Sequence, residues 1–230
     1  SADDFINELA TNILPSLNQD RLIIDIRSNP GGFIPAGERL LQLLSPNKTV
    51  ELSPVSFRST AAVQKLVTLD SLRPWKRSLD LRLQTGERFS QGITLSDLEN
   101  LPSYRYPGNV AIIVDSLSYS TSDFFAAGFR DNDLGIIIGT ESRTGAGGAN
   151  VWPYDVLAQF VNRAEGRQVM QRLPMGIGFT LSMRRSLRTG VSAGLPVEDL
   201  GTQPDEIHRL TLDDILQGNV DLLNFTASKL

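Results

Sequence analysis

The chain has 230 residues, of which 40% are hydrophobic and 21% are charged, a composition typical of a soluble globular protein with one large domain or two small ones. Its formal net charge of −4 disfavours nucleic-acid binding, which needs a basic face, and no apolar run approaches the roughly 18 residues of a membrane-spanning helix. The absence of cysteine excludes thiolate catalysis, disulfides and thiolate metal sites.

The N-terminal segment does not resemble a signal peptide, because residues 1–4 are acidic and polar, and it does not begin with methionine. We therefore expect these residues to belong to a longer chain. A chain without cysteine suits an oxidising compartment, so the cell envelope, the periplasm or a secreted location is favoured over the cytoplasm. The first predicted element is a helix over residues 5–17, capped by Asp3 or Asp4 and interrupted near Pro15.

A strand, a glycine turn and a helix follow in close succession. Residues 21–27 (RLIIDIR) predict a strand, and residues 36–44 predict a helix that ends at Ser45-Pro46. Between them, Asn29-Pro30-Gly31-Gly32 predicts a tight turn, with glycines where the backbone adopts unusual angles or approaches another group closely.

Residues 48–106 predict an insertion. Within it, residues 50–57 favour a strand, residues 60–75 a helix and residues 96–101 a short helical turn, whereas the charged residues 77–91 favour exposed surface. The insertion could cover a cleft as a lid or be a solvated excursion without function, and the sequence leaves both alternatives open.

A second strand–turn–helix unit spans residues 110–148. The apolar runs 110–114 and 136–138 predict buried strands of a parallel sheet, and residues 139–148 predict a glycine-rich loop. Ser120 opens the intervening helix. Hydroxyls at a helix start are usually caps, but a serine there also lies beside free backbone N–H groups that favour a developing oxyanion.

The remainder of the chain is less regular. Residues 151–152 favour a strand, residues 156–161 and 165–171 allow helix or edge strand, and residues 178–186 alternate as in a half-exposed strand. Residues 196–205 predict a loop. Thr211 is predicted to cap a helix over 212–217, and Asp221 to begin a terminal helix over 222–230.

Phosphate and metal sites find little support in the sequence. The glycine loop lacks Walker spacing and a following lysine, and a dinucleotide pattern starting at Gly145 would need glycine where Asn150 stands. The single histidine, His208, is without clustered carboxylates, so no metal site is predicted and no cofactor is implied.

Four blocks of sequence, in order, resemble the C-terminal processing (tail-specific) and tricorn-type serine peptidases. They are the strand and turn LIIDIRSNPGG (22–32), the segment YSTSDFFAA (119–127), Ile138-Gly139 with Thr144-Gly145-Ala146-Gly147-Gly148, and EDLGTQPD (198–205). The resemblance implies an α/β fold with a Clp protease/crotonase-like core of stacked strand–strand–helix units, as one catalytic domain over residues 1–230.

The resemblance also implies roles for single residues. Ser120 would be the nucleophile, and the backbone N–H groups of Gly32 and Thr121, with Gly31 beside them, would form the oxyanion hole. Gly31, Thr144 and Gly145 would contact a polypeptide substrate.

The general base is not evident in the sequence. The processing branch of the family uses a lysine that would fall near position 145, which is glycine here. The tricorn-like branch uses a histidine from an earlier strand, oriented by a glutamate that Glu198 matches. We therefore expect the base to lie on an upstream segment or domain of the same chain, which makes these residues inactive or weak alone.

The preferred hypothesis is a serine endopeptidase that acts through an acyl-enzyme on Ser120. The alternative is a non-catalytic ligand- or peptide-binding module on the same fold. A crotonase-like acyl-thioester enzyme is disfavoured, because that chemistry does not usually require a hydroxyl nucleophile.

Overall fold

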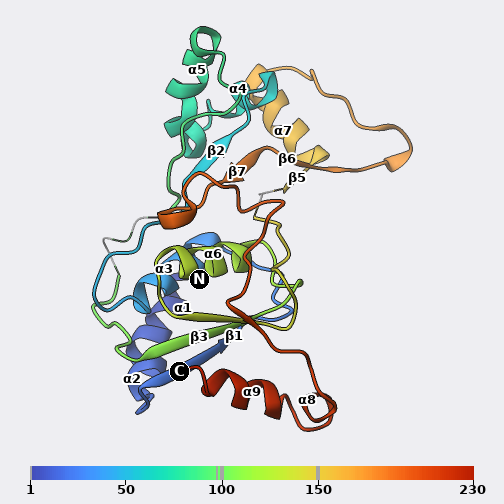
Figure 1. The fold of residues 1–230 in the computed structure, drawn as a ribbon. Helices are drawn as coiled ribbons and strands as arrows, with labels where there is room; N and C mark the ends of the chain where they lie inside the picture. The colour runs from blue at the N-terminus through green and yellow to red at the C-terminus, as the bar shows by residue number, and fades with distance from the viewer. Residues whose placement is uncertain (1, 97, 99–100, 149–150) are drawn as a thin grey trace. The chain divides into compact units, whose positions relative to one another are not determined.

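A computed structural model of the chain describes residues 2–96, 98, 101–148 and 151–230 (Figure 1). Contacts between residues divide the chain into two compact units. Unit 1 comprises Ser1–Ser53, Thr94–Gly148 and Arg188–Leu230, and unit 2 comprises Pro54–Ile93 and Ala149–Leu187. Every residue that the sequence predicts for the active site lies in unit 1.

Unit 1 is built on a parallel sheet. Its strands lie in the order β1 (Arg21–Asp25), β3 (Asn109–Val114), β4 (Ile136–Gly139) and β8 (Glu206–Ile207). In this register Asp25 pairs with Ile113, and Ile113 pairs with Ile138. Because parallel strands end at one edge of a sheet, the turns after β1 and β3 leave from the same place.

The sheet carries apolar side chains on both faces, as is typical of parallel strands with continuous apolar sequence. Ile112 lies in the cluster that contains Phe125 of α6 (Thr121–Asp131). Its neighbour Ile113 packs with Leu222 of α9 (Val220–Ala227). Figure 1 shows α3 (Ile34–Leu43) and α6 on one face of the sheet and α9 on the other. Burying such a side chain stabilises the fold by about 1.5–3 kcal/mol.

Among the helices of unit 1, α3 packs closely against the start of α6. In chain order they are α1 (Ala2–Glu8), a π-helical turn (Leu9–Ile13), α2 (Leu14–Ser16), α3 (Ile34–Leu43), α6 (Thr121–Asp131), a 3₁₀ turn (Gly190–Ser192), α8 (Leu212–Leu216) and α9 (Val220–Ala227). A Cβ atom on Gly37 of α3 would lie 3.0 Å from Cγ2 of Thr121, the first residue of α6. A side chain at position 37 would therefore force the Thr121 methyl group to shift by a few tenths of an ångström.

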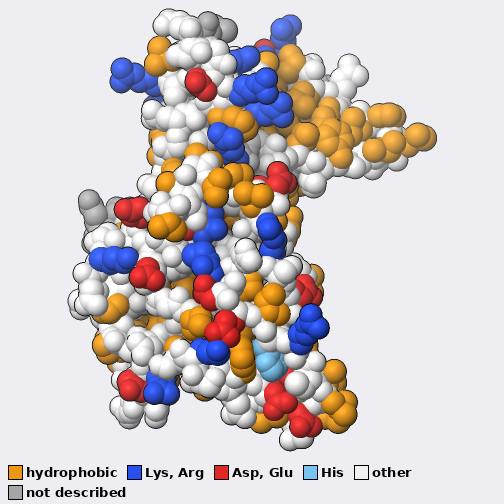
Figure 2. Space-filling model, in the orientation of Figure 1, with side chains coloured by type: hydrophobic (Ala, Val, Ile, Leu, Met, Phe, Trp, Pro, Cys, Tyr) orange, Lys and Arg blue, Asp and Glu red, His pale blue; other side chains and the backbone are white. Residues whose placement is uncertain are grey.

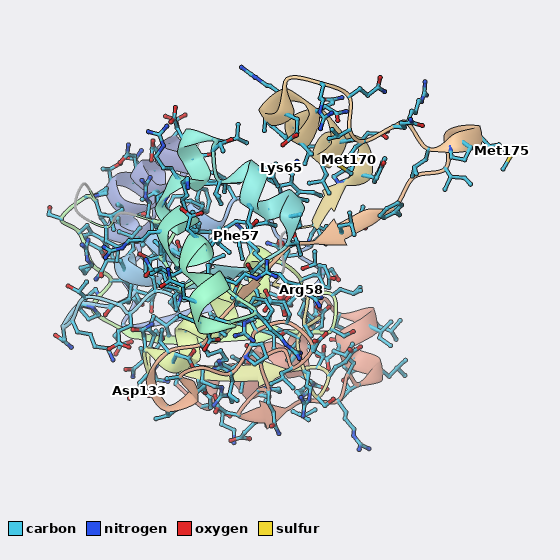
Figure 3. The ribbon with its side chains drawn as sticks, turned by 90° about the horizontal axis from the view of Figure 1, so that it is seen from above. Phe57, Arg58, Lys65, Asp133, Met170 and Met175 are labelled. Atoms are coloured by element: carbon cyan, nitrogen blue, oxygen red, sulfur yellow. The ribbon has the colours of Figure 1, made fainter. Side chains whose placement is uncertain are left out.

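Unit 2 combines two antiparallel strand pairs with helices. β2 (Val55–Phe57) pairs with β7 (Arg184–Ser186), and β5 (Val151–Pro153) pairs with β6 (Thr180–Ser182). Its helices are α4 (Ala61–Leu66), a 3₁₀ helix (Asp70–Trp75), α5 (Lys76–Thr85), α7 (Tyr154–Glu165) and a 3₁₀ turn (Pro174–Gly176). Hydrophobic side chains gather over the segment between α7 and β6 (Figure 2), and Met175 lies at its outer end (Figure 3).

The strand predicted for residues 50–57 is shorter than expected. Only Val55–Phe57 form β2. The N–H of Val50 donates to the side chain of Gln42 at 3.0 Å, and the N–H of Glu51 donates to the side chain of Asn132 at 2.7 Å. These side chains satisfy the backbone in place of a neighbouring strand, and Pro54 has no N–H to donate.

The helix predicted for 60–75 is broken, and the surface predicted for 77–91 contains a helix. Thr60 caps α4 by accepting a hydrogen bond from the N–H of Val63 at 3.2 Å, but α4 ends at Leu66. A 3₁₀ helix containing Pro74 follows. The charged sequence then forms α5, because Leu79 is fully buried and anchors one of its faces.

The insertion predicted at about 48–106 is divided between the units. Residues 54–93 join residues 149–187 in unit 2, because β2 pairs with β7. The helical turn predicted for 96–101 falls partly on residues 97, 99 and 100, which lie outside the described residues. The ambiguous segment 156–161 is helical, and the strand predicted for 178–186 is divided at Met183 into β6 and β7.

Predictions for the sheet and the long helices of unit 1 agree with the structure to within a few residues at each end. Thr211 caps α8 as predicted, within a capping box shared with Asp214. In the ranges that the structure describes, no helix is both long and apolar enough to cross a bilayer.

Candidate active site

The turns after β1 and β3 are joined by hydrogen bonds. The N–H of Ser28 donates to the carboxylate of Asp115 at 3.0 Å, and the hydroxyl of Ser118 donates to the carbonyl of Ile26 at 2.9 Å. The N–H of Tyr119 donates to the carbonyl of Asn29 at 3.0 Å. Two segments that are far apart in sequence are therefore joined at one edge of the sheet.

Ser120 lies at the point where the second turn enters α6. Its backbone has φ 58° and ψ −114°, a conformation that residues other than glycine rarely adopt. The side chain makes no capping hydrogen bond to the described residues of α6, although Ser120 occupies the N-cap position. The ordinary explanation of a serine at a helix start, that it caps the helix, does not apply here.

Gly31 touches the backbone around Ser120. Its φ is 94°, and a Cβ atom placed on it would lie 2.6 Å from the nitrogen of Thr121 and 2.7 Å from Cβ of Ser120. No side chain fits at this position. The structure therefore brings the first glycine turn into direct contact with the predicted nucleophile segment.

Thr121 and Gly32 hold the two turns together at the same point. The hydroxyl of Thr121 donates to the carbonyl of Gly32 at 2.8 Å. The N–H of Gly31 is already engaged, because it donates to the side chain of Asn29 at 2.9 Å. Space beside Gly32 is open, since a Cβ atom there would meet nothing within 4 Å. Of the two glycines, Gly31 therefore has an N–H that is occupied within its own turn, whereas open space lies beside Gly32.

Asp123 is a residue of the site that the sequence analysis missed. Its fully buried carboxylate accepts hydrogen bonds from the N–H groups of Ala146 and Gly147, each at 2.9 Å. Burial raises the pKa of the Asp123 carboxyl, against the hydrogen bonds from Thr144, Gly147, Ala146 and Ser120, which lower it. Its position three residues after Ser120 is that of a capping-box acid, which is the signal that the sequence offered.

The glycine-rich loop packs on Tyr119. The N–H of Gly145 donates to the carbonyl of Ser118 at 2.9 Å. Cβ atoms on Gly145 and Gly147 would collide with the ring of Tyr119, at 2.5 and 1.8 Å. The glycines therefore make room for an aromatic ring beside Ser120. The hydroxyl of Thr144, a predicted substrate contact, accepts from the N–H of Thr202 at 2.8 Å.

Glu198 is held next to the same loop. The N–H of Asp199 donates to the carbonyl of Ala146 at 3.1 Å. Val197 is fully buried, and its Cγ1 would lie 2.9 Å from a Cβ atom on Gly148. Both neighbours of Glu198 in sequence thus contact the loop that Asp123 ties to the start of α6.

His208 contacts the side chains of Asp214 and Phe225. Its Nε2 lies 2.7 Å from the carboxylate of Asp214, and its ring centroid lies 5.3 Å from that of Phe225. Burial opposes the charge on Asp214, but hydrogen bonds from Thr211, His208 and Leu222 outweigh it and lower the pKa of that carboxyl. Among the described residues, no group of three or more His, Cys, Asp or Glu side chains could hold a metal ion.

Comparison with known proteins identifies the family. A sequence model described as "Peptidase family S41" matches residues 2–181. The chain belongs to peptidase family S41. This confirms the resemblance that the four sequence blocks carry. A comparison with curated proteins gives no significant match.

Solved structures confirm the fold of this S41 chain. It superposes on the structure of mature CPAF complexed with lactacystin with a TM-score of 0.68 and 20% identity, over 99% of this chain and 46% of that one. It superposes on a lipoprotein from Streptococcus agalactiae with a TM-score of 0.53 and 15% identity, over 100% of this chain and 61% of that one. The predicted Clp protease/crotonase-like α/β fold is confirmed. This chain spans less than two thirds of either structure.

Proposed function

We propose that this chain carries the catalytic core of a serine endopeptidase, in which the hydroxyl of Ser120 attacks the carbonyl carbon of a peptide bond. The observation that carries the proposal is the backbone of Ser120, with φ 58° between β3 and α6 and the Gly31 backbone packed against it. Strained backbone positions cluster at active sites, and a sharp strand-to-helix turn is how some hydrolases expose a nucleophilic serine. Membership of a peptidase family supports a polypeptide substrate.

Two backbone N–H groups are proposed to stabilise the negative charge that develops on the carbonyl oxygen. The N–H of Thr121 belongs to the first turn of α6, where N–H groups lack intrahelical partners and the helix dipole favours an anion. The N–H of Gly32 lies on the facing turn, which the Thr121 hydroxyl binds at 2.8 Å. Loss of one oxyanion donor typically slows such a reaction roughly 10²- to 10³-fold.

The base is proposed to be a histidine from outside these 230 residues, oriented by Glu198. Two observations support this. The single histidine of the chain, His208, is bound to Asp214, and the chain covers only 46% of the CPAF structure. The base would take the hydroxyl proton of Ser120 and deliver it to the leaving amine, and water would then release the acyl-enzyme. A location outside the cytoplasm stays a prediction of the sequence.

The proposal is tested by labelling the full-length protein with a small fluorophosphonate and locating the adduct by mass spectrometry. We expect the adduct on Ser120 and its loss in Ser120→Ala. Ser122→Ala is the matched control, because Ser122 is a buried serine two positions away in the same helix. An unlabelled protein, or an adduct on another serine, contradicts the proposal and favours the ligand-binding module without turnover.

A further inference from the structure

The arm (residues 166–179), which joins α7 to β6, extends away from the helices of unit 2 (Figures 1 and 3). Met175, at its outer end, is 92% exposed, and Ile177 and Phe179 are 55% and 47% exposed. The apolar tip of the arm (residues 173–179, LPMGIGF) contains no charged, hydroxyl or amide side chain. Exposed apolar side chains that gather in this way mark a surface that binds a protein or a membrane.

Two polar side chains of α7 hold the base of the arm. The side chain of Asn162 accepts a hydrogen bond from the N–H of Met170 and donates one to its carbonyl, both at 2.8 Å. The hydroxyl of Tyr154 donates to the carbonyl of Gln171, and its backbone N–H donates to the carbonyl of Phe179, both at 2.9 Å. Tyr154 therefore binds both ends of the segment that carries the apolar tip, so the exposed tip starts from a fixed base.

Unit 2 is basic although the chain as a whole is acidic. It holds 12 of the 22 Lys and Arg residues but 5 of the 26 Asp and Glu residues, which gives it a formal net charge of +7. Unit 1 holds the other charged residues and has a formal net charge of −11. Such a separation of charge within one chain indicates binding to a charged surface, and the sign for unit 2 requires an anionic one.

Arginines lie at the base of the arm and are absent from its tip. Arg163 in the last turn of α7, Arg167 and Arg172 are all exposed. Arg172 precedes Met175 by three residues, so an extended chain separates them by at most roughly 10 Å. Apolar groups of proteins that bind membrane surfaces lie roughly 5–10 Å deep, at the boundary of headgroups and acyl chains. Figure 2 shows basic side chains beside the hydrophobic ones on this face of unit 2.

We propose that the arm binds an anionic lipid surface, with the apolar tip at the boundary of headgroups and acyl chains and the arginines beside the lipid phosphates. Insertion stops at this boundary, because an irregular loop cannot satisfy its backbone N–H and C=O groups in hydrocarbon. A nucleic acid would match the charge but offers no apolar environment to the tip. A protein partner is less well matched, because the tip lacks the polar side chains that form hydrogen bonds across protein interfaces.

The proposal is tested by sedimenting the full-length protein with vesicles of phosphatidylcholine alone or of phosphatidylcholine and phosphatidylglycerol in equal amounts. Each basic residue near an anionic surface strengthens binding roughly 5-fold, so we expect at least about 10-fold tighter binding to the anionic vesicles. High salt is expected to weaken this binding by screening. Equal binding to both kinds of vesicle, or binding to neither, overturns the proposal.

Variants with matched controls locate the contact on the arm. Ile177→Asp is expected to weaken binding to anionic vesicles at least about 10-fold, because it removes apolar burial. Ile215→Asp, at a 71% exposed isoleucine of α8 in unit 1, is expected to bind as wild type does. Arg172→Gln is expected to weaken binding roughly 5-fold, and Arg209→Gln, at an exposed arginine of unit 1, is expected to leave it unchanged. Wild-type binding by Ile177→Asp overturns the proposal.

A fluorescent reporter at the tip distinguishes insertion from adsorption by charge alone. In Met175→Trp the emission that exceeds that of wild type is expected to shift to shorter wavelength with anionic vesicles, and an unshifted emission in the bound protein overturns the proposal. If no vesicle binds and Ile177→Asp instead abolishes self-association of the protein, the arm is a protein contact and the proposal fails. Fluorophosphonate labelling of Ser120 is expected to be equal in Ile177→Asp and wild type, so this proposal and the proposed function fail independently.

Discussion

At the scale of single residues, Gly31 and Ser120 adopt backbone angles that most residues avoid, and they touch each other. Glycine adopts such angles without strain, but at Ser120 the strain persists only where the surrounding structure enforces it. Here the enforcement comes from both turns, through the bonds that Asp115, Ser118 and Thr121 make across them. The geometry of the site is therefore set by backbone packing as much as by side-chain chemistry.

Gly31 and Gly32 provide a matched pair for testing this packing. Gly31→Ala is expected to lower the free energy of unfolding by about 1–2 kcal/mol from its backbone angle alone, and further because the new Cβ meets the Thr121 nitrogen at 2.6 Å. Gly32→Ala is expected to be far milder, because nothing lies within 4 Å of its Cβ position. Denaturant unfolding of both variants measures the difference, and equal stabilities would contradict the described contact.

At the scale of elements, the buried carboxylate of Asp123 joins α6 to the glycine loop, and the loop in turn contacts both neighbours of Glu198. A substitution of Asp123 should therefore change the positions of both the predicted nucleophile, Ser120, and the predicted orienting glutamate, Glu198. Asp123 is a positioning residue in this account, because no step of the reaction is assigned to it.

Asp123→Ala is expected to displace the loop and slow fluorophosphonate labelling of Ser120 roughly 10²-fold, since small misplacements of a reactive group have effects of this size. Asp131→Asn is the matched control, because Asp131 is a buried acid at the other end of α6 that pairs with Arg188. We expect it to lower stability while leaving the labelling rate of the folded protein near wild type. If Asp123→Ala is labelled at the wild-type rate, Asp123 does not position Ser120.

Elements with a strong local signal could be predicted from the sequence, and those that depend on distant partners could not. The apolar runs of β3 and β4 are buried along almost their whole length, so their sequence pattern is enough to predict strands there. Residues 50–54 carry strand-like sequence, but Gln42 and Asn132 bind the backbone there. The pairing of β2 with β7, which defines unit 2, joins segments that no local pattern relates.

The residues of the candidate site divide in the same way, into those with a local sequence signal and those that depend on distant partners. Ser120, the glycine turn and Glu198 lie in blocks with a family pattern, so the sequence points to them. Asp123 was missed because an acid in the first turn of a helix usually interacts with that turn, and its partners Ala146 and Gly147 become visible only in the fold. The hollow of about 240 Å³ that Phe5, Phe33 and Phe125 line beside Gly32 and Thr121 was missed because these residues meet only in space.

At the scale of the whole molecule, the C-terminal segment of unit 1 contains a buried carboxylate, that of Asp214. The carboxylate of Asp214 accepts hydrogen bonds from the N–H groups of Thr211 at 2.9 Å and Leu222 at 2.7 Å, besides its contact with His208. These bonds lower the pKa of Asp214 from 3.8 despite its burial. A carboxylate with a lowered pKa stabilises the folded state above its ordinary pKa and loses that effect as the pH falls below it.

Asp214→Asn is therefore expected to be less stable than wild type at neutral pH, and the difference in unfolding free energy is expected to shrink as the pH falls below about 3.8. Denaturant unfolding across this range measures the difference. Asp213→Asn, an exposed neighbour in the same helix, is the control and is expected to show a small difference at every pH. A difference that is independent of pH, or that grows on acidification, would contradict the assignment.

The central claim is that the Ser120 hydroxyl and the N–H groups of Gly32 and Thr121 converge on one carbonyl. A crystal structure of the full-length protein with a peptide boronic acid tests this directly, because the boron adduct imitates the tetrahedral intermediate. We predict a bond from boron to the Ser120 oxygen and a boronate oxygen roughly 2.7–3.1 Å from both nitrogens. A boronate bonded to another residue, or one whose oxygen points away from both N–H groups, would contradict the account.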